Sequence, residues 1–326
     1  MPRRPNPAEK LREELLALRA DPTSEPALQL LRKGLASATG LVVEAAARIV
    51  GEAELDSLAP LLASAFPRFV QADAVKRDPG CRAKVSIVQA LVKLRVPADE
   101  VFLAGIRHRQ LEPAFGGPAD TAAMLRGHCA MGLALMGEPS APVAVAELLA
   151  DPEAVARAAA VQALTCIPPS TAEPLLRYKI RVGDEEPQVA AECFRSLLAI
   201  APSSGIAVVA GYLGDRSEEL AEQAALALGE SRLPEAFPRL HEVAETAMGS
   251  LRRVVLLAIA MLRSNESRDY LLERLAAADG TTAAHVLDAL AIYRHDAVLR
   301  ERVMETVARR GDAALLAAAR ERMQGS

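Results

Sequence analysis

The sequence has no Trp and few aromatic residues of any kind: Phe, Tyr and Trp make up 3% of its 326 residues. Strands favour aromatic and β-branched side chains, so this scarcity argues against a β-sandwich. The apolar residues, 51% of the chain, are instead mainly Ala, Leu and Val. Small apolar side chains allow helix axes to approach closely, and the composition therefore favours many packed helices.

The chain also lacks any run of about 18 apolar residues, the length that a membrane-spanning helix needs. The basic N-terminus, Met1 to Pro7, is followed by charged residues rather than by the apolar run of a signal peptide. We therefore expect a cytoplasmic protein with no membrane partner. The net charge of −4 argues against a general affinity for nucleic acid.

No pair of cysteines has the Cys-x-x-Cys spacing of a zinc or redox site. The four cysteines, each in or at the end of an apolar helix pattern, are Cys81, Cys129, Cys166 and Cys193. We expect them to be buried free thiols. Nucleotide-binding loops and the local signatures of catalytic nucleophiles are also missing. The sequence therefore predicts no enzyme activity, no catalytic residue, no cofactor and no metal.

One pattern recurs from about residue 41 onward: a helix with small and aliphatic residues on one face, a turn, and a second helix. We expect the first helices of eight copies at residues 41–50, 82–91, 124–133, 155–164, 189–198, 219–228, 253–262 and 283–292. The last residues of these ranges are spaced by 41, 42, 31, 34, 30, 34 and 30 positions. A period of this length with two helices per repeat indicates an α-solenoid.

Asp and Pro residues mark the expected helix boundaries. Asp-Pro pairs at Asp78 and Asp151 precede helices of the first type. An Asp there can cap the free N–H groups of the first turn, and a Pro is tolerated because its missing N–H would have no partner. Prolines such as Pro97 and Pro139 precede helices of the second type.

The segment from Asp151 to Leu164 is an Asp-Pro turn that leads into an Ala-rich helix ending in Ala-Leu. It resembles the bacterial HEAT-like repeats, and the shorter copies are similar to those of the phycobilisome-lyase type. The resemblance covers about residues 41–310 and implies an all-α fold, a right-handed α-α superhelix (HEAT-like solenoid) of about nine helix pairs. It does not imply a function, because one fold serves many functions. We expect a single array over residues 1–326, with capping helices at 1–40 and 311–326.

Two insertions, at residues 66–80 and 110–120, account for the two longest spacings. Both lie between the second helix of one repeat and the first helix of the next. Equivalent turns of a solenoid stack along one edge, so we expect the insertions to be neighbours. Residues 66–110 hold nine Lys and Arg against four Asp and Glu. This local charge of +5 leaves −9 for the rest of the chain.

Basic side chains and loop aromatics within an acidic chain suggest a binding edge. The candidate binding residues are Phe69, Lys76, Arg77, Arg82, His108, Arg109, Glu112, Phe115 and Asp120. The function predicted from this pattern is a non-enzymatic scaffold for protein–protein interaction, with an unidentified partner that is acidic or polar. An alternative interpretation is structural: the insertions close gaps in the stack, and Phe66, Phe69 and Phe115 are plugs.

Two further functions remain as alternatives. The loop edge near residues 76–84 and 107–128 could serve an enzyme, a small ligand or a metal, with His108, Glu112, Asp120 and His128 as a conceivable set of ligands. A continuous positive face over residues 66–110 would instead support binding of nucleic acid. Two families of HEAT-like enzymes fit less well. Di-iron hydroxylases repeat a His-Glu pair that occurs here once, at His241, and DNA glycosylases rely on Trp and a basic face.

Overall fold

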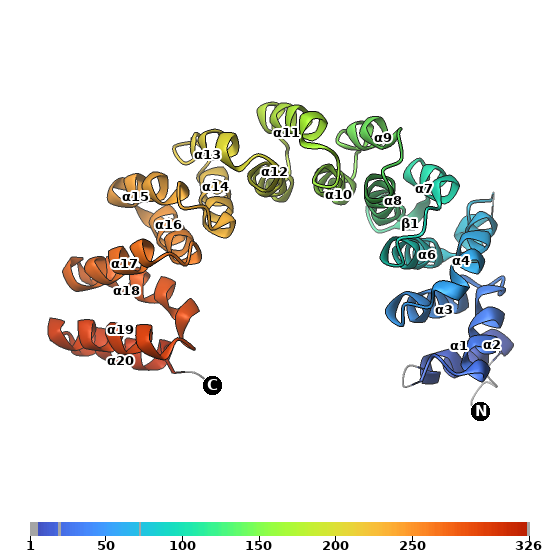
Figure 1. Ribbon diagram of the computed structural model, residues 1–326, viewed down its shortest axis with the longest axis horizontal. Coiled ribbons are helices and arrows are strands. Elements are labelled where there is room, and N and C mark those ends of the chain that lie inside the picture. The colour runs from blue at the N-terminus through green and yellow to red at the C-terminus, as the bar shows by residue number, and fades with distance from the viewer. Residues whose placement is uncertain (1–5, 19–20, 72, 325–326) are drawn as a thin grey trace. The chain divides into compact units, whose positions relative to one another are not determined.

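The computed structural model describes residues 6–18, 21–71 and 73–324 (Figure 1). The chain divides into two compact units, Met1–Leu175 (unit 1) and Leu176–Ser326 (unit 2). Their boundary falls inside one helix, α11 (Pro169–Val182). Almost all regular structure among the described residues is helical, and the exception is one two-stranded sheet in unit 1.

Unit 1 holds the first half of the repeat pattern together with both insertions. Its helices are α1 (Pro7–Ala17), α2 (Glu25–Leu35), α3 (Gly40–Glu52), α4 (Ala59–Ala65), α5 (Ala74–Arg77), α6 (Arg82–Lys93), α7 (Asp99–Ile106), α8 (Ala123–Met136), α9 (Ala141–Leu148) and α10 (Ala154–Leu164). Its 3-10 helices are η2 (Asp56–Leu58), η3 (Phe66–Phe69) and η4 (Pro79–Cys81). Its strands are β1 (Leu111–Ala114) and β2 (Gly117–Asp120).

Unit 2 continues the alternation of helices without a long insertion. Its helices are α12 (Pro187–Ile200), α13 (Pro202–Ala210), α14 (Glu218–Ser231), α15 (Ala236–Thr246), α16 (Gly249–Met261), α17 (Asn265–Ala277), α18 (Gly280–Leu290), α19 (Ala297–Arg310) and α20 (Ala313–Arg322), with the 3-10 helix η5 (Ala291–Tyr293) after α18.

Within each unit, the first helix of one repeat packs against the first helix of the next. The helices in this layer are α3, α6, α8 and α10 in unit 1, and α12, α14, α16, α18 and α20 in unit 2. The second helices, such as α7 and α9 or α13 and α15, contact these first helices and form the other layer. Stacking in this way buries the apolar stripe of each helix, which a single repeat could not do alone.

The predicted fold class is confirmed: the chain is all-α, and its helices follow one another as sequential pairs. A helix occupies each of the eight ranges expected for first helices. The helices α1 and α2 lie within residues 1–40, and α20 lies within residues 311–326, where capping helices were expected.

The two aspartates named from the sequence precede the N-caps of their helices, which are Cys81 for α6 and Glu153 for α10. Asp78 still accepts from the backbone N–H groups of Ala83 and Lys84 in the first turn of α6, and Asp151 accepts from that of Glu153.

Aspartates also begin other helices. Asp279, Asp296 and Asp312 are the N-caps of α18, α19 and α20, and each side chain accepts a hydrogen bond from the backbone N–H three residues later. These bonds satisfy donors that have no partner inside the helix.

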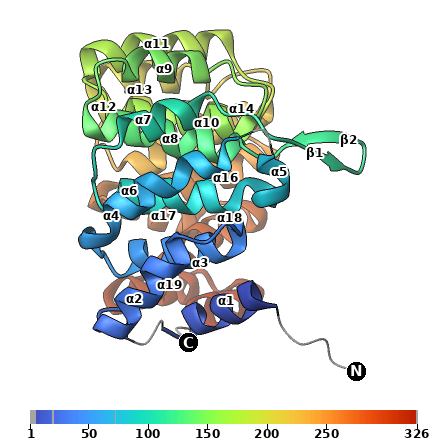
Figure 2. The same ribbon diagram turned by 90° about the vertical axis from the view of Figure 1, so that its right-hand side faces the viewer.

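The insertions have regular structure of their own. Residues 66–80 form η3, α5 and most of η4, whereas residues 110–120 form the antiparallel hairpin of β1 and β2. The hairpin can turn sharply because Gly116 and Gly117 adopt positive φ angles of 93° and 130°, which a glycine reaches without steric cost. Figure 2 shows the hairpin projecting beyond the ends of the helices of unit 1.

Candidate functional site

The two insertions meet at the base of the hairpin, as the stacking of equivalent turns predicts. The backbone N–H of Gly80 donates a hydrogen bond to Glu112 Oε1 at 2.7 Å, and Gln110 Nε2 donates to the carbonyl oxygen of Asp78 at 2.9 Å. Glu112 Oε1 also accepts from Thr121 Oγ1 at 2.7 Å and from Gln110 Nε2 at 2.8 Å. The first strand is therefore tied both to the first insertion and to the end of its own partner strand.

A buried lysine anchors the first insertion from inside. Lys84 Nζ donates to the carbonyl oxygen of Phe69 at 3.0 Å and to Gln110 Oε1 at 2.8 Å, and it lies 3.0 Å from Asp78 Oδ2. The side chains of Lys84 and Asp78 are 0% and 1% exposed. A buried charge is tolerated when it is paired and fully hydrogen-bonded, which is the situation here.

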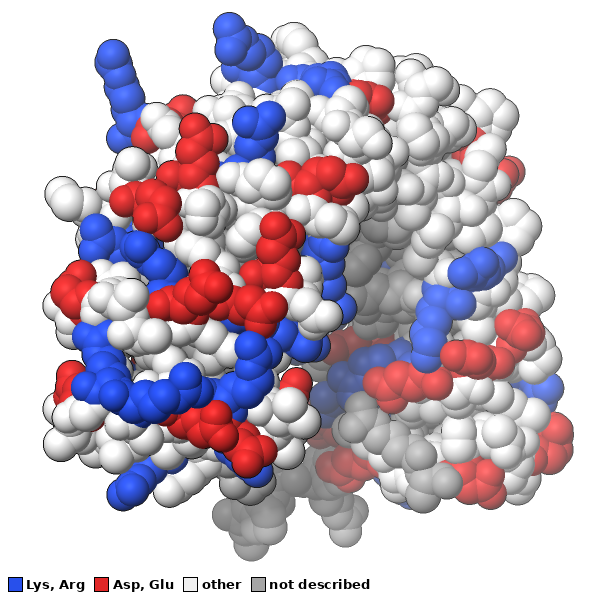
Figure 3. Space-filling model, turned by 60° about the vertical axis from the view of Figure 1, so that its left-hand side comes forward, with Lys and Arg blue, Asp and Glu red and all other residues white. Residues whose placement is uncertain are grey.

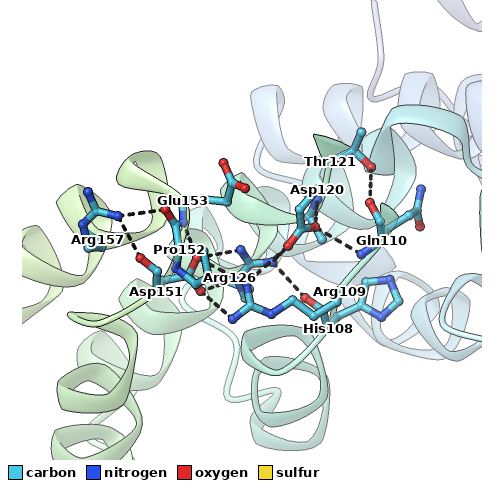
Figure 4. A network of polar contacts seen from close by, with 11 residues as sticks. His108, Arg109, Gln110, Asp120, Thr121, Arg126, Asp151, Pro152, Glu153 and Arg157 are labelled. Carbon is cyan, nitrogen blue, oxygen red and sulfur yellow. Dashed lines mark hydrogen bonds and ion pairs between the residues drawn. The ribbon is translucent and has the colours of Figure 1, made fainter. Parts of the chain in front are cut away.

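A second buried cation, Arg126, anchors the hairpin to the next repeat (Figure 4). Its Nε and Nη2 donate to the Asp151 carboxylate, each at 2.8 Å. Its Nη1 donates to Asp120 Oδ2 at 2.8 Å and to the carbonyl oxygen of His108 at 3.0 Å. The guanidinium fork thus joins the end of β2, the turn after α7 and the turn before α10.

Arg109 approaches the same two carboxylates from the solvent side. Its Nη1 lies 3.2 Å from Asp120 Oδ2, and its Nη2 lies 2.9 Å from Asp151 Oδ2, while its own side chain is 47% exposed. Asp120 Oδ1 in turn accepts from the backbone N–H groups of Gln110 and Ala122. The two networks therefore share Gln110 and form one continuous polar base beneath the hairpin.

These interactions lower the pKa values of the carboxyl groups. Burial opposes ionisation of Asp151, but hydrogen bonds from Arg126 and from the Glu153 N–H outweigh it and hold the pKa below its usual value. For Asp120, burial is likewise outweighed by the Ala122 and Gln110 N–H groups and by Arg126. Both carboxylates are accordingly ionised and fully engaged at neutral pH.

The network also repeats along the chain. Asp78, Asp120 and Asp151 each lie 13 residues before the last residue of an expected first helix. A cation follows six residues after each of them: Lys84, Arg126 and Arg157. Sequence reasoning missed the three cations, together with Gln110 and Thr121. The Asp–cation spacing therefore recurs in three successive repeats, but it does not show which cations are buried: Lys84 and Arg126 are buried, whereas Arg157 is only partly buried.

The hairpin itself presents apolar side chains to solvent. Phe115, at its tip, has a relative exposure of 111%, and Leu111 has 62%. Pro113 faces Pro118 across the ladder. Proline has no N–H, so this pair occupies a position of the ladder without cross-strand hydrogen bonds. At such a position an N–H group would point away from the partner strand, so each outer edge of the hairpin lacks one donor.

The candidate binding residues fall into three groups. Lys76, Arg82 and Phe115 are exposed and make no ion pair within the described part of the chain. Arg77, His108, Arg109, Glu112 and Asp120 contact other groups of the protein or are partly buried. Phe69 is 0% exposed, so it supports the edge from inside the core and offers no surface to a partner.

The two phenylalanines proposed as plugs at residues 66 and 69 are both buried, whereas Phe115 is not. Buried phenylalanines that close a gap are therefore found in η3, whereas the exposed aromatic residue expected of a binding edge is found in the hairpin.

Three of the four residues considered as metal ligands have other partners, and Nε2 of the fourth, His108, is buried without a hydrogen-bond partner in the described part of the chain. Glu112 and Asp120 belong to the polar base, and His128 Nε2 contacts Gln89 Nε2 at 2.9 Å. Across the described ranges, no three His, Cys, Asp or Glu side chains are grouped so that they could hold a metal ion. Burial lowers the pKa of His108, a shift that the nearby Lys84 reinforces.

Positive charge is dispersed. Five of the nine Lys and Arg residues between positions 66 and 110 are held by other groups of the protein: Arg68, Arg77, Lys84, Lys93 and Arg109. Figure 3 draws another face, with unit 2 forward, and there Lys and Arg lie among Asp and Glu. Where the structure describes the chain, it contains no helix with the length and apolar character needed to cross a membrane.

Comparisons with known proteins find likeness in structure alone. No family model and no curated protein sequence matches the chain. A chain in the complex of CpcE and CpcF of phycocyanin lyase from Nostoc sp. PCC7120 is 18% identical, with a TM-score of 0.40, and the match covers 80% of this chain and 94% of that one. An engineered protein is 16% identical over 98% of this chain and 94% of its own, with a TM-score of 0.38.

Human deoxyhypusine hydroxylase in complex with glycerol is 16% identical over 77% of this chain and 88% of its own, with a TM-score of 0.32. All three likenesses are in structure and at low sequence identity.

Proposed function

We propose that this protein is a non-enzymatic scaffold for protein–protein interaction, and that the β1–β2 hairpin is its recognition element. The observation that carries the proposal is the full exposure of Phe115 at the tip of a hairpin whose base is fixed by buried ion pairs. An aromatic side chain left in water forgoes the free energy of burial, roughly 1.5–3 kcal/mol. A partner that covers Phe115 would recover that free energy.

The geometry of the hairpin supports recognition through side chains rather than through added strands. Exposed strand edges normally invite further strands, and prolines are one means of blocking them. Pro113 and Pro118 remove one donor from each outer edge of this hairpin. The partner would therefore bind the tip and the apolar side chains, and not extend the sheet.

The nearby exposed cations favour an acidic or polar partner. Arg82 lies two residues after Gly80. Because the N–H of Gly80 donates to Glu112 of β1, Arg82 lies close to the base of the hairpin. Arg and Phe are suited to anchoring a partner, because Arg offers a rigid fork of donors and Phe offers contact area at little entropic cost. Charge at such a rim acts mainly on the association rate and is screened by salt.

Two finer assignments belong to the same proposal. The repeats are of the bacterial phycobilisome-lyase type, which the Asp-Pro motif and its spacing support. The scaffold acts in the cytoplasm, which the charged residues that follow Pro7 support.

The decisive experiment compares two variants in capture from native lysate. Phe115→Ser removes the exposed ring without touching the ties at the base of the hairpin. Met248→Ser, in unit 2, is the matched control, because Met248 is another exposed apolar residue at 73%. Proteins held by the wild type would be identified by mass spectrometry, and the affinity of the purified partner would then be measured for all three proteins.

We expect Phe115→Ser to lose the partner and Met248→Ser to keep it at unchanged affinity. A truncating substitution at an interface anchor costs about 2 kcal/mol or more, which is a loss of roughly 30-fold in affinity. Equal capture by the wild type and by Phe115→Ser would refute the hairpin as the recognition element.

A further inference from the structure

A second surface of unit 1 is an apolar groove on the layer of second helices. It lies between α4 with η3 on one side and α7 with the turn before it on the other, and its volume is about 920 Å³. Its walls are mostly apolar: Pro60, Ala63, Phe66, Pro67, Pro97 and Ala104. This volume is in the upper part of the range, roughly 300–1,000 Å³, that is typical of ligand sites.

The walls of the groove are held in place without an occupant. Arg68, in η3, donates from Nη1 to the carbonyl oxygen of Ala36 at 2.8 Å and from Nη2 to that of Leu35. Phe66 is 1% exposed, and a Cβ added at Gly105 of α7 would meet its ring at 3.4 Å. The groove is therefore pre-formed, which lowers the entropic cost of binding.

The charged residues that line the groove are all acidic. Asp56, Asp99 and Glu100 line it, and no Lys or Arg does so. The three side chains are exposed, and none of them takes part in an ion pair over residues 6–18, 21–71 and 73–324. An occupant should therefore combine an apolar face with positive charge at its margins.

The chemistry of the walls also selects the backbone conformation of the occupant. Three prolines in the walls have no N–H, the alanines and Phe66 offer no polar side-chain atoms, and the hydroxyl of Ser64 already donates to the carbonyl oxygen of Leu61 at 3.0 Å. An extended peptide would leave its own N–H and C=O groups without partners there, at a cost in free energy. A helix satisfies those groups internally and presents only side chains.

We propose that this groove docks a short amphipathic helix of a partner protein, with aliphatic residues at i, i+3, i+4 and i+7 toward the groove and Lys or Arg at its margins. The site is separate from the hairpin, so it stands or falls independently of the recognition role of Phe115.

The test uses a fluorescein-labelled peptide of about four helical turns, built from Leu at those positions and Lys elsewhere. Two control peptides carry Glu in place of Lys, or the same residues in scrambled order. Fluorescence anisotropy would measure binding to the full chain, with circular dichroism as a check on the folding of every variant.

Two variants address the groove. Ala104→Trp fills it without changing charge, and the pair Asp99→Lys with Glu100→Lys reverses its rim. The matched controls lie in unit 2, on exposed positions: Ala314→Trp for bulk, and Glu185→Lys with Glu242→Lys for charge.

We expect the Leu–Lys peptide to bind, with both groove variants losing about tenfold or more in affinity and both controls close to the wild type. The Glu peptide and the scrambled peptide should bind at least about tenfold more weakly. The variant Phe115→Ser should bind the peptide as the wild type does.

Three outcomes would overturn the proposal. Equal losses in the rim reversal and in its unit 2 control would mean that attraction is general rather than local. Unchanged affinity in Ala104→Trp would place the peptide elsewhere. Self-association of the wild type that Ala104→Trp abolishes, measured by sedimentation, would make a second copy of the chain the occupant.

Discussion

Arg126 illustrates how a single residue can bind several segments that are distant in sequence. Its guanidinium contacts Asp120, Asp151 and the carbonyl of His108, and its side chain is 1% exposed. Removing one member of a buried ion pair leaves the other charge without compensation, which is far more costly than losing a surface pair.

The substitution Arg126→Met should therefore lower the free energy of unfolding of unit 1 by about 3–5 kcal/mol. Two buried carboxylates would keep only the half-exposed Arg109 as a cation. Urea unfolding followed by circular dichroism would measure the change. The control is Arg309→Met, since Arg309 pairs with Glu305 at the surface and is 76% exposed. A shift in Arg126→Met no larger than in this control would mean that the buried network contributes little.

The carboxylates of Asp120 and Asp151 also make the stability of unit 1 depend on pH under acidic conditions. The pKa values of Asp120 and Asp151 in the folded protein lie below the usual 3.8. Their contribution to the free energy of unfolding is therefore complete above about pH 3.8 and disappears as the pH falls through the folded-state pKa. The wild type should lose stability steeply below about pH 4. In Arg126→Met the carboxyl pKa values rise, and this dependence should flatten. Urea midpoints from pH 5 to 2, in roughly half-unit steps, would test it, and parallel curves for the two proteins would contradict it.

At the scale of the element, close approach of first helices depends on glycine and alanine. A Cβ at Gly229 of α14 would lie 2.5 Å from the carbonyl oxygen and 2.7 Å from the Cα of Ala258 in α16. A Cβ at Gly127 of α8 would similarly lie 2.4 Å from the Cβ of Ala159 in α10. The abundance of small residues in the sequence is thus used where helix backbones nearly touch.

Gly229→Val should push α14 and α16 apart and destabilise unit 2 by about 1–3 kcal/mol, despite the better helix propensity of Val. Gly280→Val is the control, because Gly280 is also helical but has no atom within 4 Å of its added Cβ. Thermal unfolding followed by circular dichroism would compare the two variants. If both lowered the melting temperature equally, close packing at Gly229 would not be the cause.

At the scale of the whole molecule, the chain is two compact units built from the same kind of repeat. Each repeat contacts mainly its neighbours, so damage in one region need not spread through the array. The cysteines report on both units, because Cys81 and Cys129 lie in unit 1 and Cys193 in unit 2. All three are buried, and burial raises the pKa of Cys81 and of Cys193 to about 12.

Pulsed alkylation in rising urea should therefore resolve the two units. In Arg126→Met, Cys129 should become reactive at lower urea than in the wild type, while Cys193 keeps its wild-type profile. Cys166, which is partly exposed, should react first in both proteins. Mass spectrometry of the labelled peptides would read each site. Simultaneous exposure of Cys129 and Cys193 would show that the chain unfolds as one cooperative body.

The sequence alone determined the helical architecture, because helix boundaries and apolar stripes are local properties. Asp and Pro punctuation and a period near 30–42 residues sufficed to place all eight first helices. It also located the two insertions and their proximity, since equivalent turns of a repeat array must stack.

Only the tertiary structure decided what the insertions do. Lys84 and Arg126 carry charge, and their sequence context does not say whether that charge faces water or a buried carboxylate of another segment. Phe69 and Phe115 are likewise the same residue type in adjacent insertions, yet one is 0% and the other 111% exposed. Burial of a side chain depends on which distant segments close over it, and that follows from packing between repeats rather than from the pattern within one.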